Sequence, residues 1–217
     1  MVTLDQVRHD EGVRNYIEKA DESLIALGFT EHSFPHVAKT AAVASSILEK
    51  LGYDERTCEL AAIAGWLHDI GNIVNRIEHA QSGAVMAFRI LADMGMPADE
   101  VATVITAIGN HDEGTAFPVN AVAAALILGD KTDVRRNRVR NTDIPSFDIH
   151  DRVNYSVEHS EVNLVNDEVR LELTIDTSIC PVMSYFEIFM QRMLLCRKAA
   201  EKLGLKFALI INEQKIM

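Results

Sequence analysis

The first 140 residues of this chain carry apolar side chains that recur three and four positions apart, and glycine or proline interrupts this pattern at nearly regular intervals. Such spacing places the apolar residues on one face of an α-helix, and glycine is the residue that most often follows a helix end. The pattern predicts amphipathic helices over residues 13–27, 35–51, 54–70, 79–94, 97–109 and 119–134. We therefore expect residues 1–140 to form an all-α body.

Beyond Arg140 the period changes. Residues 152–176 alternate apolar and polar side chains on either side of an Asn-Asp turn signal, which is typical of an antiparallel hairpin. Residues 181–203 predict a long helix that ends at Gly204, and the run KFALIIN predicts a last strand beside the hairpin. We expect a mainly α fold: a helical bundle over residues 1–140, and a small C-terminal antiparallel β-sheet with a long helix over residues 141–217, packed on the bundle as an α+β appendage.

Composition limits the classes of function. The chain has 217 residues, of which 48% are hydrophobic and 24% charged, as in a globular protein with a buried core. Its formal charge of −11 argues against binding to nucleic acid or to an anionic membrane. The three scattered cysteines predict neither a disulfide framework nor a thiolate zinc site, and the N-terminal residues show no apolar signal segment. We expect a cytoplasmic protein that acts on a small molecule.

The residues that could carry chemistry are eight histidines, four of which directly precede an aspartate. His36 and His68 each lie 16 positions from Gly52, the turn of one predicted helical hairpin, and His79 and His111 stand in the same relation to the glycine of the next hairpin. At about 1.5 Å per residue, each histidine lies about 24 Å from its turn. Because few residues join the hairpins, the sequence predicts four imidazoles at one end of the bundle.

Two carboxylates accompany the imidazoles. Asp69 follows His68 directly, and Asp130 lies inside the apolar stretch of the last body helix. Burying a lone carboxylate is costly unless it is paired or binds a metal, and a metal is also the simplest account of clustered imidazoles. Nitrogen and oxygen ligands without cysteine favour iron, manganese, cobalt or zinc.

Six ligands exceed the need of one hydrolytic ion, so we expect two divalent ions bridged by Asp69. One ion would take His36, His68 and Asp130, and the other would take His79 and His111. Such a pair would bind two oxygens of a phosphate and hold a bridging hydroxide for in-line attack. Of the remaining histidines, His32 is close enough in sequence to line the mouth of a pocket, whereas His9, His150 and His159 are expected to be ordinary surface or packing residues.

The segments LHDIGN around His68-Asp69 and ALILGDKTD around Asp130, together with His36, resemble the HD-domain superfamily of metal-dependent phosphohydrolases over about residues 30–140. His79 and His111 resemble the added ligands of its dinuclear branch, which includes HD-GYP cyclic-dinucleotide phosphodiesterases and bacterial diadenosine-tetraphosphate hydrolases. The resemblance implies a bundle of five or more helices. It also implies the six-ligand set above, with Asp69 bridging two ions, of which iron is the favoured metal.

Two departures from the family pattern bear on the substrate. Many members carry a lysine where this chain has Asn72, which removes a cation that would pair with phosphate. No GYP tripeptide follows His111, which disfavours cyclic di-GMP. Lys131 beside Asp130 is the best candidate for an anion clamp. The full set of predicted substrate-binding residues is Lys131, Arg135, Arg136, His32 and Asn72, with Arg138 and Arg140 in the same basic stretch.

The leading hypothesis is a phosphohydrolase or phosphodiesterase acting on a nucleotide-like or small phosphate ester, with metal-bound hydroxide as nucleophile and Asp69 and Lys131 as catalytic residues. A few superfamily members with the same six ligands are mixed-valent di-iron oxygenases, which is the first alternative. The second is a non-catalytic module in which the C-terminal sheet recruits a partner. The free edge of the predicted sheet also suggests a homodimer.

Overall fold

Several helices begin at a side-chain oxygen that accepts a hydrogen bond from a backbone N–H of the first turn, which satisfies a donor that helix geometry leaves free. These capping residues are Thr3, Asp10, Asp54, Asn120 and Asp148. The computed structural model describes residues 1–217, apart from the side chain of residue 145. Its α-helices are α1 (Leu4–His9), α2 (Glu11–Ala26), α3 (Phe34–Lys50), α4 (Glu55–Leu67), α5 (His79–Asp93), α6 (Ala98–Gly109), α7 (Ala121–Lys131), α8 (Ile149–Ser156) and α9 (Val182–Lys202).

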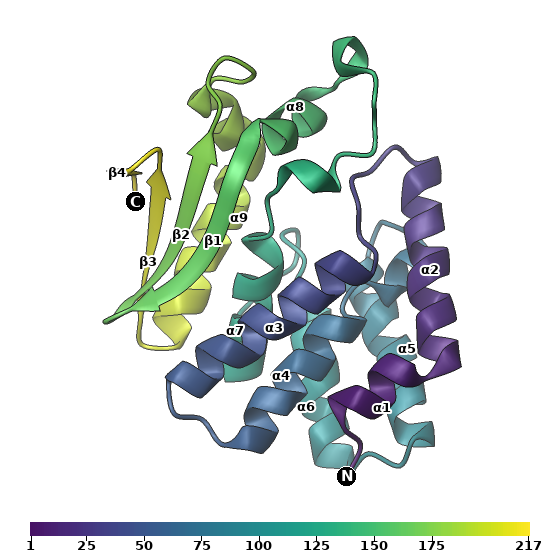
Figure 1. The fold of residues 1–217 in the computed structure, drawn as a ribbon. Helices are drawn as coiled ribbons and strands as arrows, with labels where there is room; N and C mark the ends of the chain where they lie inside the picture. The colour runs from purple at the N-terminus through teal and green to yellow at the C-terminus, as the bar shows by residue number, and fades with distance from the viewer.

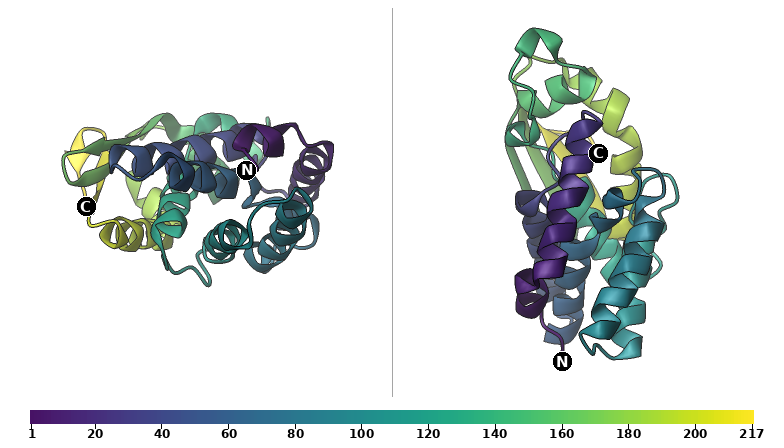
Figure 2. Two further views of the ribbon diagram at one scale, coloured as in Figure 1. Left: turned by 90° about the horizontal axis from the view of Figure 1, so that it is seen from below. Right: turned by 90° about the vertical axis from the view of Figure 1, so that its right-hand side faces the viewer.

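Short 3-10 helices and strands complete the chain. The 3-10 helices are η1 (Ile70–Ile73), η2 (Arg136–Arg138) and η3 (Ile144–Ser146), and the strands are β1 (Val157–Val165), β2 (Glu168–Ile175), β3 (Lys206–Ile211) and β4 (Gln214–Lys215). The helices of the body lie on one side of the molecule and the sheet on the other (Figure 1). The N-terminus lies at the end of the body away from α8 (Figure 1), and the right-hand view of Figure 2 shows it at the same end. The predicted mainly α fold is confirmed.

Helix α3 packs against both α4 and α7. Glycines permit this close approach. A Cβ atom added to Gly65 of α4 would lie 2.7 Å from Cα of Ala41, and one added to Gly129 of α7 would lie 2.6 Å from the carbonyl oxygen of Thr40. Because real Cβ atoms do not come so close, both positions require glycine for the backbones to pack at this distance.

The two hairpins that place the histidines turn at glycines, as the sequence predicts. Gly52 between α3 and α4 has φ +78°, and Gly95 between α5 and α6 has φ +83°. This left-handed conformation is open to glycine without a Cβ penalty and is a common way to end a helix. The body helices therefore run as antiparallel pairs whose open ends lie away from these turns.

Some predicted boundaries are wrong. Residues 4–9 form an additional N-terminal helix, and the predicted helix over residues 54–70 ends at Leu67, followed by η1. Residues 152–156 belong to α8 rather than to a strand, because Asp148 caps this helix at the backbone N–H of Asp151 and the side chain of Asn154 donates to the carbonyl oxygen of His150. Three alternating apolar residues are too few to distinguish a strand from one turn of helix.

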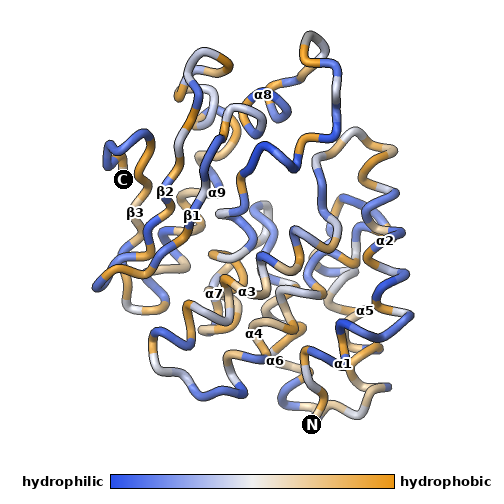
Figure 3. Tube along the Cα trace, in the orientation of Figure 1, coloured by the Kyte–Doolittle hydropathy of each residue, from blue (hydrophilic) through white to orange (hydrophobic). Residues whose placement is uncertain are grey.

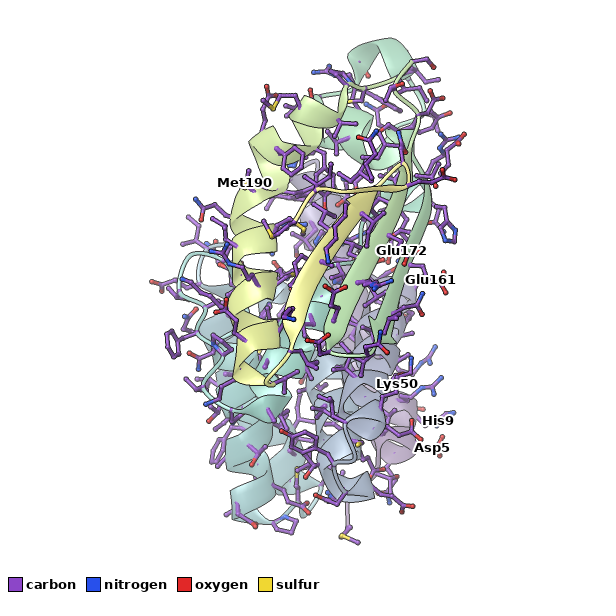
Figure 4. The ribbon with its side chains drawn as sticks, turned by 90° about the vertical axis from the view of Figure 1, so that its left-hand side faces the viewer. Asp5, His9, Lys50, Glu161, Glu172 and Met190 are labelled. Carbon is purple, nitrogen blue, oxygen red and sulfur yellow. The ribbon has the colours of Figure 1, made fainter. Side chains whose placement is uncertain are left out.

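The C-terminal sheet is mixed, which corrects the prediction of an antiparallel sheet. Strand order is β1-β2-β3-β4, with β1 and β2 paired antiparallel and β2 and β3 paired parallel. Helix α9 carries the chain back along the sheet before β3 begins, and a crossover of this kind joins parallel strands. Glu161 and Glu172 are partners across β1 and β2 and lie on the face turned away from α9 (Figure 4). Leu171, which neighbours Glu172 in β2, is buried.

Helix α9 packs against α7 on one side and against β2 and β3 on the other. The core at this junction includes Ile127 and Leu128 of α7 together with Phe189 of α9 and Leu209 of β3. By contrast, the segment between α7 and α8 is largely hydrophilic (Figure 3). Among the described residues, none of the helices combines the length and apolarity that crossing a membrane requires. The division of the chain at residue 140 stays a prediction.

Candidate metal centre

The fold brings the six predicted ligand side chains together, and each of them is buried. They are His36 in the first turn of α3, His68 and Asp69 directly after α4, His79 at the start of α5, His111 just after α6, and Asp130 near the end of α7. These positions all lie at the open ends of the helical hairpins. We refer to this set as the candidate metal centre.

The imidazoles face one another in two pairs. Nε2 of His36 lies 3.2 Å from Nε2 of His68, and Nε2 of His79 lies 3.2 Å from Nε2 of His111. The pairs adjoin, since the ring centroids of His68 and His111 are 5.0 Å apart with the rings at 90°. Two nitrogen ligands of one ion, each about 2.1 Å from it, are separated by about 3 Å. The spacing within each pair therefore fits a shared metal ion.

An acceptor at Nδ1 fixes the orientation of each ring. The acceptors are Oδ2 of Asp133 for His36 at 2.8 Å, the carbonyl of Gly65 for His68 at 2.8 Å, the carbonyl of Arg76 for His79 at 3.0 Å, and the carbonyl of Ile108 for His111 at 2.6 Å. Carbonyl and carboxylate oxygens accept hydrogen bonds, so Nδ1 carries the proton and the neutral ring presents a lone pair at Nε2. Each pair thus sets two lone pairs against each other, an arrangement that requires a cation between them.

In the first pair, a proton on His68 can take the place of the cation between the two lone pairs. Burial lowers the pKa of His68, but the carboxylates of Asp69 and Asp130 outweigh this effect and raise the pKa to about 10. Burial holds the pKa of His111 well below its usual value and also lowers the pKa of His79. The pair of His79 and His111 is therefore neutral at pH 7, and its lone pairs are suited to a metal ion rather than to a proton.

The carboxylate of Asp69 lies between the two pairs. Its Oδ2 is 3.5 Å from Nε2 of His36 and 3.2 Å from Nε2 of His68, while its Oδ1 is 3.4 Å from Nε2 of His79 and 4.0 Å from Nε2 of His111. One oxygen therefore serves each pair. This is the arrangement in which a single carboxylate could bridge two ions.

Asp130 serves the first pair alone. Its Oδ1 lies 3.4 Å from Nε2 of His36 and 3.7 Å from Nε2 of His68. Burial raises the pKa of Asp130, but the nearby Lys131 and the two imidazoles outweigh this and hold it well below its usual value. Asp130 is therefore an anion at neutral pH, in the form that binds a metal.

A chain of charges leads from the centre to α9. Nζ of Lys131 lies 2.7 Å from Oδ2 of Asp130 and 3.1 Å from Oε2 of Glu113, and Oε1 of Glu113 lies 2.5 Å from Nε of Arg192. Although burial raises the pKa of Glu113, Lys131 and Arg192 lower it to about 2. The ammonium of Lys131, predicted as an anion clamp, is thus held between two carboxylates.

Asp133 is a functional candidate that the sequence analysis missed. Its side chain is fully buried and accepts from Nδ1 of His36, while Lys39, Arg135 and Arg138 surround it at 3.1, 2.6 and 3.6 Å. Burial raises its pKa, but His36 and Arg138 hold the pKa of Asp133 well below its usual value. A carboxylate behind a ligand imidazole fixes the ring and makes Nε2 a better donor to a metal. The second aspartate of the GDKTD segment was the available signal.

Asn72, predicted to contact substrate, lies behind Asp69 and is 2% exposed. Its side-chain amide donates to Oδ1 of Asp69 at 3.0 Å, and its Oδ1 accepts from Nη1 of Arg76 at 3.2 Å. The same Nη1 lies 3.3 Å from Nε2 of His79. Arg76, which the sequence analysis also missed, therefore reaches the second pair of imidazoles.

The basic stretch after Lys131 is largely engaged by protein acceptors. Arg135 binds Asp133 and Glu31, Arg136 donates to the carbonyl of Tyr155 at 2.5 Å, Arg138 donates to the carbonyls of Glu31 and Asp133, and Arg140 pairs with Asp21. Arg135 adjoins the centre through Asp133, whereas Arg136 reaches toward the start of β1. These contacts tie the segment between α7 and α8 to the body.

A cavity of about 210 Å³ lies where the body meets the C-terminal part of the chain. We refer to it as the seam cavity. The body contributes His32 and Arg76 to its lining, and α8 and α9 contribute Asn154, Phe189 and Arg192, among others. The ring of His32 lies 5.3 Å from that of His36, and Arg76 contacts His79, so the seam cavity adjoins the candidate metal centre.

The remaining histidines lie outside the centre. His9 is exposed and pairs with Asp5, and His159 is exposed on β1 beside Glu161. His150 lines the seam cavity from α8. Of these three, only His150 lines the seam cavity in the described part of the chain.

The chain is similar to known proteins in sequence and in structure. Residues 34–144, slightly more than half of the chain, match the family described as HD domain. An uncharacterized protein of Methanocaldococcus jannaschii is 26% identical over 184 residues, which cover 73% of this chain and 70% of that protein. The crystal structure of a predicted HD superfamily hydrolase from an uncultured Thermotogales bacterium is similar at a TM-score of 0.46 and 26% identity, covering 58% of this chain and 69% of that one.

Proposed function

The chain belongs to the HD-domain family of metal-dependent hydrolases, and we propose on this basis that it hydrolyses a small phosphate ester with the help of two divalent metal ions. The observation that carries the proposal is the arrangement of Nε2 atoms in two facing pairs, with one oxygen of Asp69 directed to each pair. Neutral imidazoles and carboxylates are donors that manganese, iron, cobalt and zinc accept.

The ligand residues fall into two groups. His36, His68 and Asp130 would hold one ion, and His79 and His111 would hold the other, with Asp69 shared. When bound, such ions supply Lewis acidity toward a phosphoryl oxygen and lower the pKa of a water molecule. We favour iron as the metal at both positions, with manganese, cobalt and zinc as alternatives.

The residues around the ligands keep them in place. Asn72 orients Asp69 through the hydrogen bond to Oδ1, and Asp133 orients His36 through Nδ1. Lys131 neutralises part of the negative charge of Asp130 and Glu113. We assign Lys131 to holding Asp130 toward the first imidazole pair, because its ammonium already has two carboxylate partners.

Phosphate release tests the proposal. Protein stripped of metal and reloaded with Mn²⁺ is assayed against a panel of nucleotides and sugar phosphates. We expect release that requires the metal and that His68→Ala abolishes, whereas His9→Ala retains it, since His9 is an exposed imidazole outside the centre. No release from any ester, with His68→Ala behaving as the unmodified protein, would contradict the proposal.

The oxygenase alternative predicts that activity depends differently on the metal and on oxygen. A mixed-valent di-iron enzyme would consume oxygen with iron and would be inert with Mn²⁺, whereas a hydrolase works equally well without oxygen. Anaerobic assay of the Mn²⁺ form therefore separates the two. A protein that purifies without metal, keeps its fold unchanged under chelation and shows no turnover would instead support the non-catalytic module.

A further inference from the structure

We propose that Arg76 binds the terminal oxygens of the substrate's phosphoryl group, and that the substrate is a phosphate monoester whose organic group lies in the seam cavity. This inference rests on the proposed function and specifies its substrate class. Nothing in the sequence motifs points to Arg76. The contacts of its guanidinium carry the argument.

Arg76 lies between η1 and α5 at the edge of the candidate metal centre. Its guanidinium is 5.4 Å from the ring centroid of Phe29, which holds the side chain over the seam cavity. Nη1 lies 3.2 Å from Oδ1 of Asn72 and 3.3 Å from Nε2 of His79. The guanidinium therefore touches both the lining of the cavity and a predicted metal ligand.

The charge of Arg76 is not neutralised by a partner. Among the described side chains, no carboxylate oxygen comes within 4.0 Å of its guanidinium. Lys131 and Arg192 both pair with Glu113. The cations behind His36, which are Lys39, Arg135 and Arg138, each have an oxygen of Asp133 within 4.0 Å. A guanidinium presents several N–H donors in a planar fork that matches the oxygens of phosphate. Arg76 is thus the cation best placed to receive an anion.

Metal binding would free a donor of Arg76. Nδ1 of His79 donates to the backbone carbonyl of residue 76, so the lone pair that Nη1 now contacts is at Nε2. This is the atom with which His79 would bind an ion, and a lone pair shared with a metal no longer accepts from a guanidinium. The freed N–H group then needs another acceptor at the same place, and a phosphoryl oxygen meets that need.

The surroundings favour a monoester over a diester. The imidazoles of His36, His68 and His111 are 0% exposed, so protein closes the centre on their sides. The seam cavity, lined by Arg76 and His32, gives room of about 210 Å³ beside the centre. A monoester places one organic group in this space and turns its remaining oxygens toward Arg76. A diester would need room for a second organic group.

The test uses Mn²⁺-loaded full-length protein, with inorganic phosphate as the binding probe and p-nitrophenyl phosphate and bis(p-nitrophenyl) phosphate as a monoester and a diester with the same leaving group. The variants are Arg76→Ala, Arg76→Lys and Arg76→Gln. The matched control is Arg8→Ala, because Arg8 also lies over an aromatic ring, that of Trp66 at 5.0 Å, but lines a different cavity.

We expect Arg76→Ala to weaken phosphate binding, measured by calorimetry, and to raise KM for the monoester, each by about 10- to 100-fold, the effect of a lost charge-assisted hydrogen bond. Manganese content should stay unchanged, Arg76→Lys should recover part of the loss, and Arg8→Ala should match the unmodified protein. If Arg76→Ala does not fold, Arg76→Gln is measured in its place, with the same expected losses.

Two results would overturn the inference. One is phosphate binding by a folded Arg76 variant that equals that of the unmodified protein. The other is turnover of the diester in preference to the monoester, which would leave the proposed hydrolase in place but with another substrate class. If neither ester, nor any member of the nucleotide and sugar-phosphate panel, is cleaved while phosphate binding still depends on Arg76, the proposed function fails and the anion site stands.

Discussion

Oδ2 of Asp133 lies 2.8 Å from Nδ1 of His36, so a carboxylate backs this imidazole, whereas backbone carbonyls back those of His68, His79 and His111. A carboxylate behind a ligand histidine strengthens its donation to a metal more than a carbonyl does. The first pair also has Asp130 beside it. We therefore expect the two ions to be held with unequal affinity, the tighter one at His36 and His68.

Asp133→Asn tests this asymmetry. The amide keeps the size of the side chain but removes the negative charge behind His36, so affinity for the first Mn²⁺ should fall by about 10- to 100-fold. Calorimetric titration measures it, with Asp54→Asn as a control, since Asp54 caps α4 at an exposed site. Unchanged affinity in a folded variant would argue against a role for Asp133 in positioning His36.

Gly71→Ala should damage the approach of η1 to α5. A Cβ atom there would lie 2.0 Å from the carbonyl oxygen of His79 and 2.4 Å from the backbone nitrogen of Gly83. The backbone shift that relieves this overlap should lower the free energy of unfolding by about 1–3 kcal/mol and should displace His79. Urea unfolding measures the loss of stability. Gly109→Ala is the control, because its added Cβ would meet Cβ of Ala84 at an ordinary 3.7 Å. Equal stability of the two variants would contradict the prediction.

Metal binding should stabilise the folded chain. An ion that binds the native state alone, at 100 times its dissociation constant, contributes about 2.7 kcal/mol. For a chain of this length that corresponds to a rise of about 5–10 °C in Tm. Thermal unfolding with increasing Mn²⁺ measures the rise, and His68→Ala should abolish most of it. If His68→Ala shows the full rise in Tm with Mn²⁺, the ion binds elsewhere.

The ion pair of Arg56 and Glu100, which joins α4 to α6, should make stability depend on pH. Nε of Arg56 lies 2.8 Å from Oε1 of Glu100, and this hydrogen bond, despite some burial, lowers the pKa of Glu100 below 4.5. A lowered pKa stabilises the fold above about pH 4.5, and the contribution is lost as the pH falls through the folded-state value.

Glu100→Gln should therefore cost about 1 kcal/mol at pH 7, and the deficit should shrink toward pH 3. Urea unfolding at both pH values checks this result. Glu22→Gln is the control, because Glu22 pairs with Lys19 at a largely exposed site. A deficit in Glu100→Gln that does not change with pH would mean that the carboxylate charge contributes nothing.

The sequence predicted the helical body and the convergence of the histidines because both follow from helix periodicity and from glycine turns. Counting residues from Gly52 is enough to bring His36 beside His68 when the helices are straight and antiparallel. The parallel pairing of β2 and β3 was also within reach, since a long helix between two strands favours it. The compartment and the homodimer stay predictions.

Arg76, Glu113 and Asp133 were missed for a different reason. Their importance comes from which side chains they touch, and those contacts depend on loop paths and rotamers that periodicity does not determine. Arg76 lies in the short connection between η1 and α5, where no repeating pattern constrains the backbone. Arg192 lies on a long helix whose rotation about its axis decides whether it reaches Glu113.

The double engagement of Glu113, by Lys131 at one oxygen and by Arg192 at the other, has an evolutionary consequence. A substitution of Arg192 in α9 is transmitted through three ion pairs, Arg192–Glu113, Glu113–Lys131 and Lys131–Asp130, to a carboxylate of the candidate metal centre. If related chains exchanged their C-terminal segments, residue 113 or residue 192 would lose its ion-pair partner unless both residues were exchanged together. We therefore expect residues 113 and 192, which lie far apart in the chain but form an ion pair, to vary together among related chains.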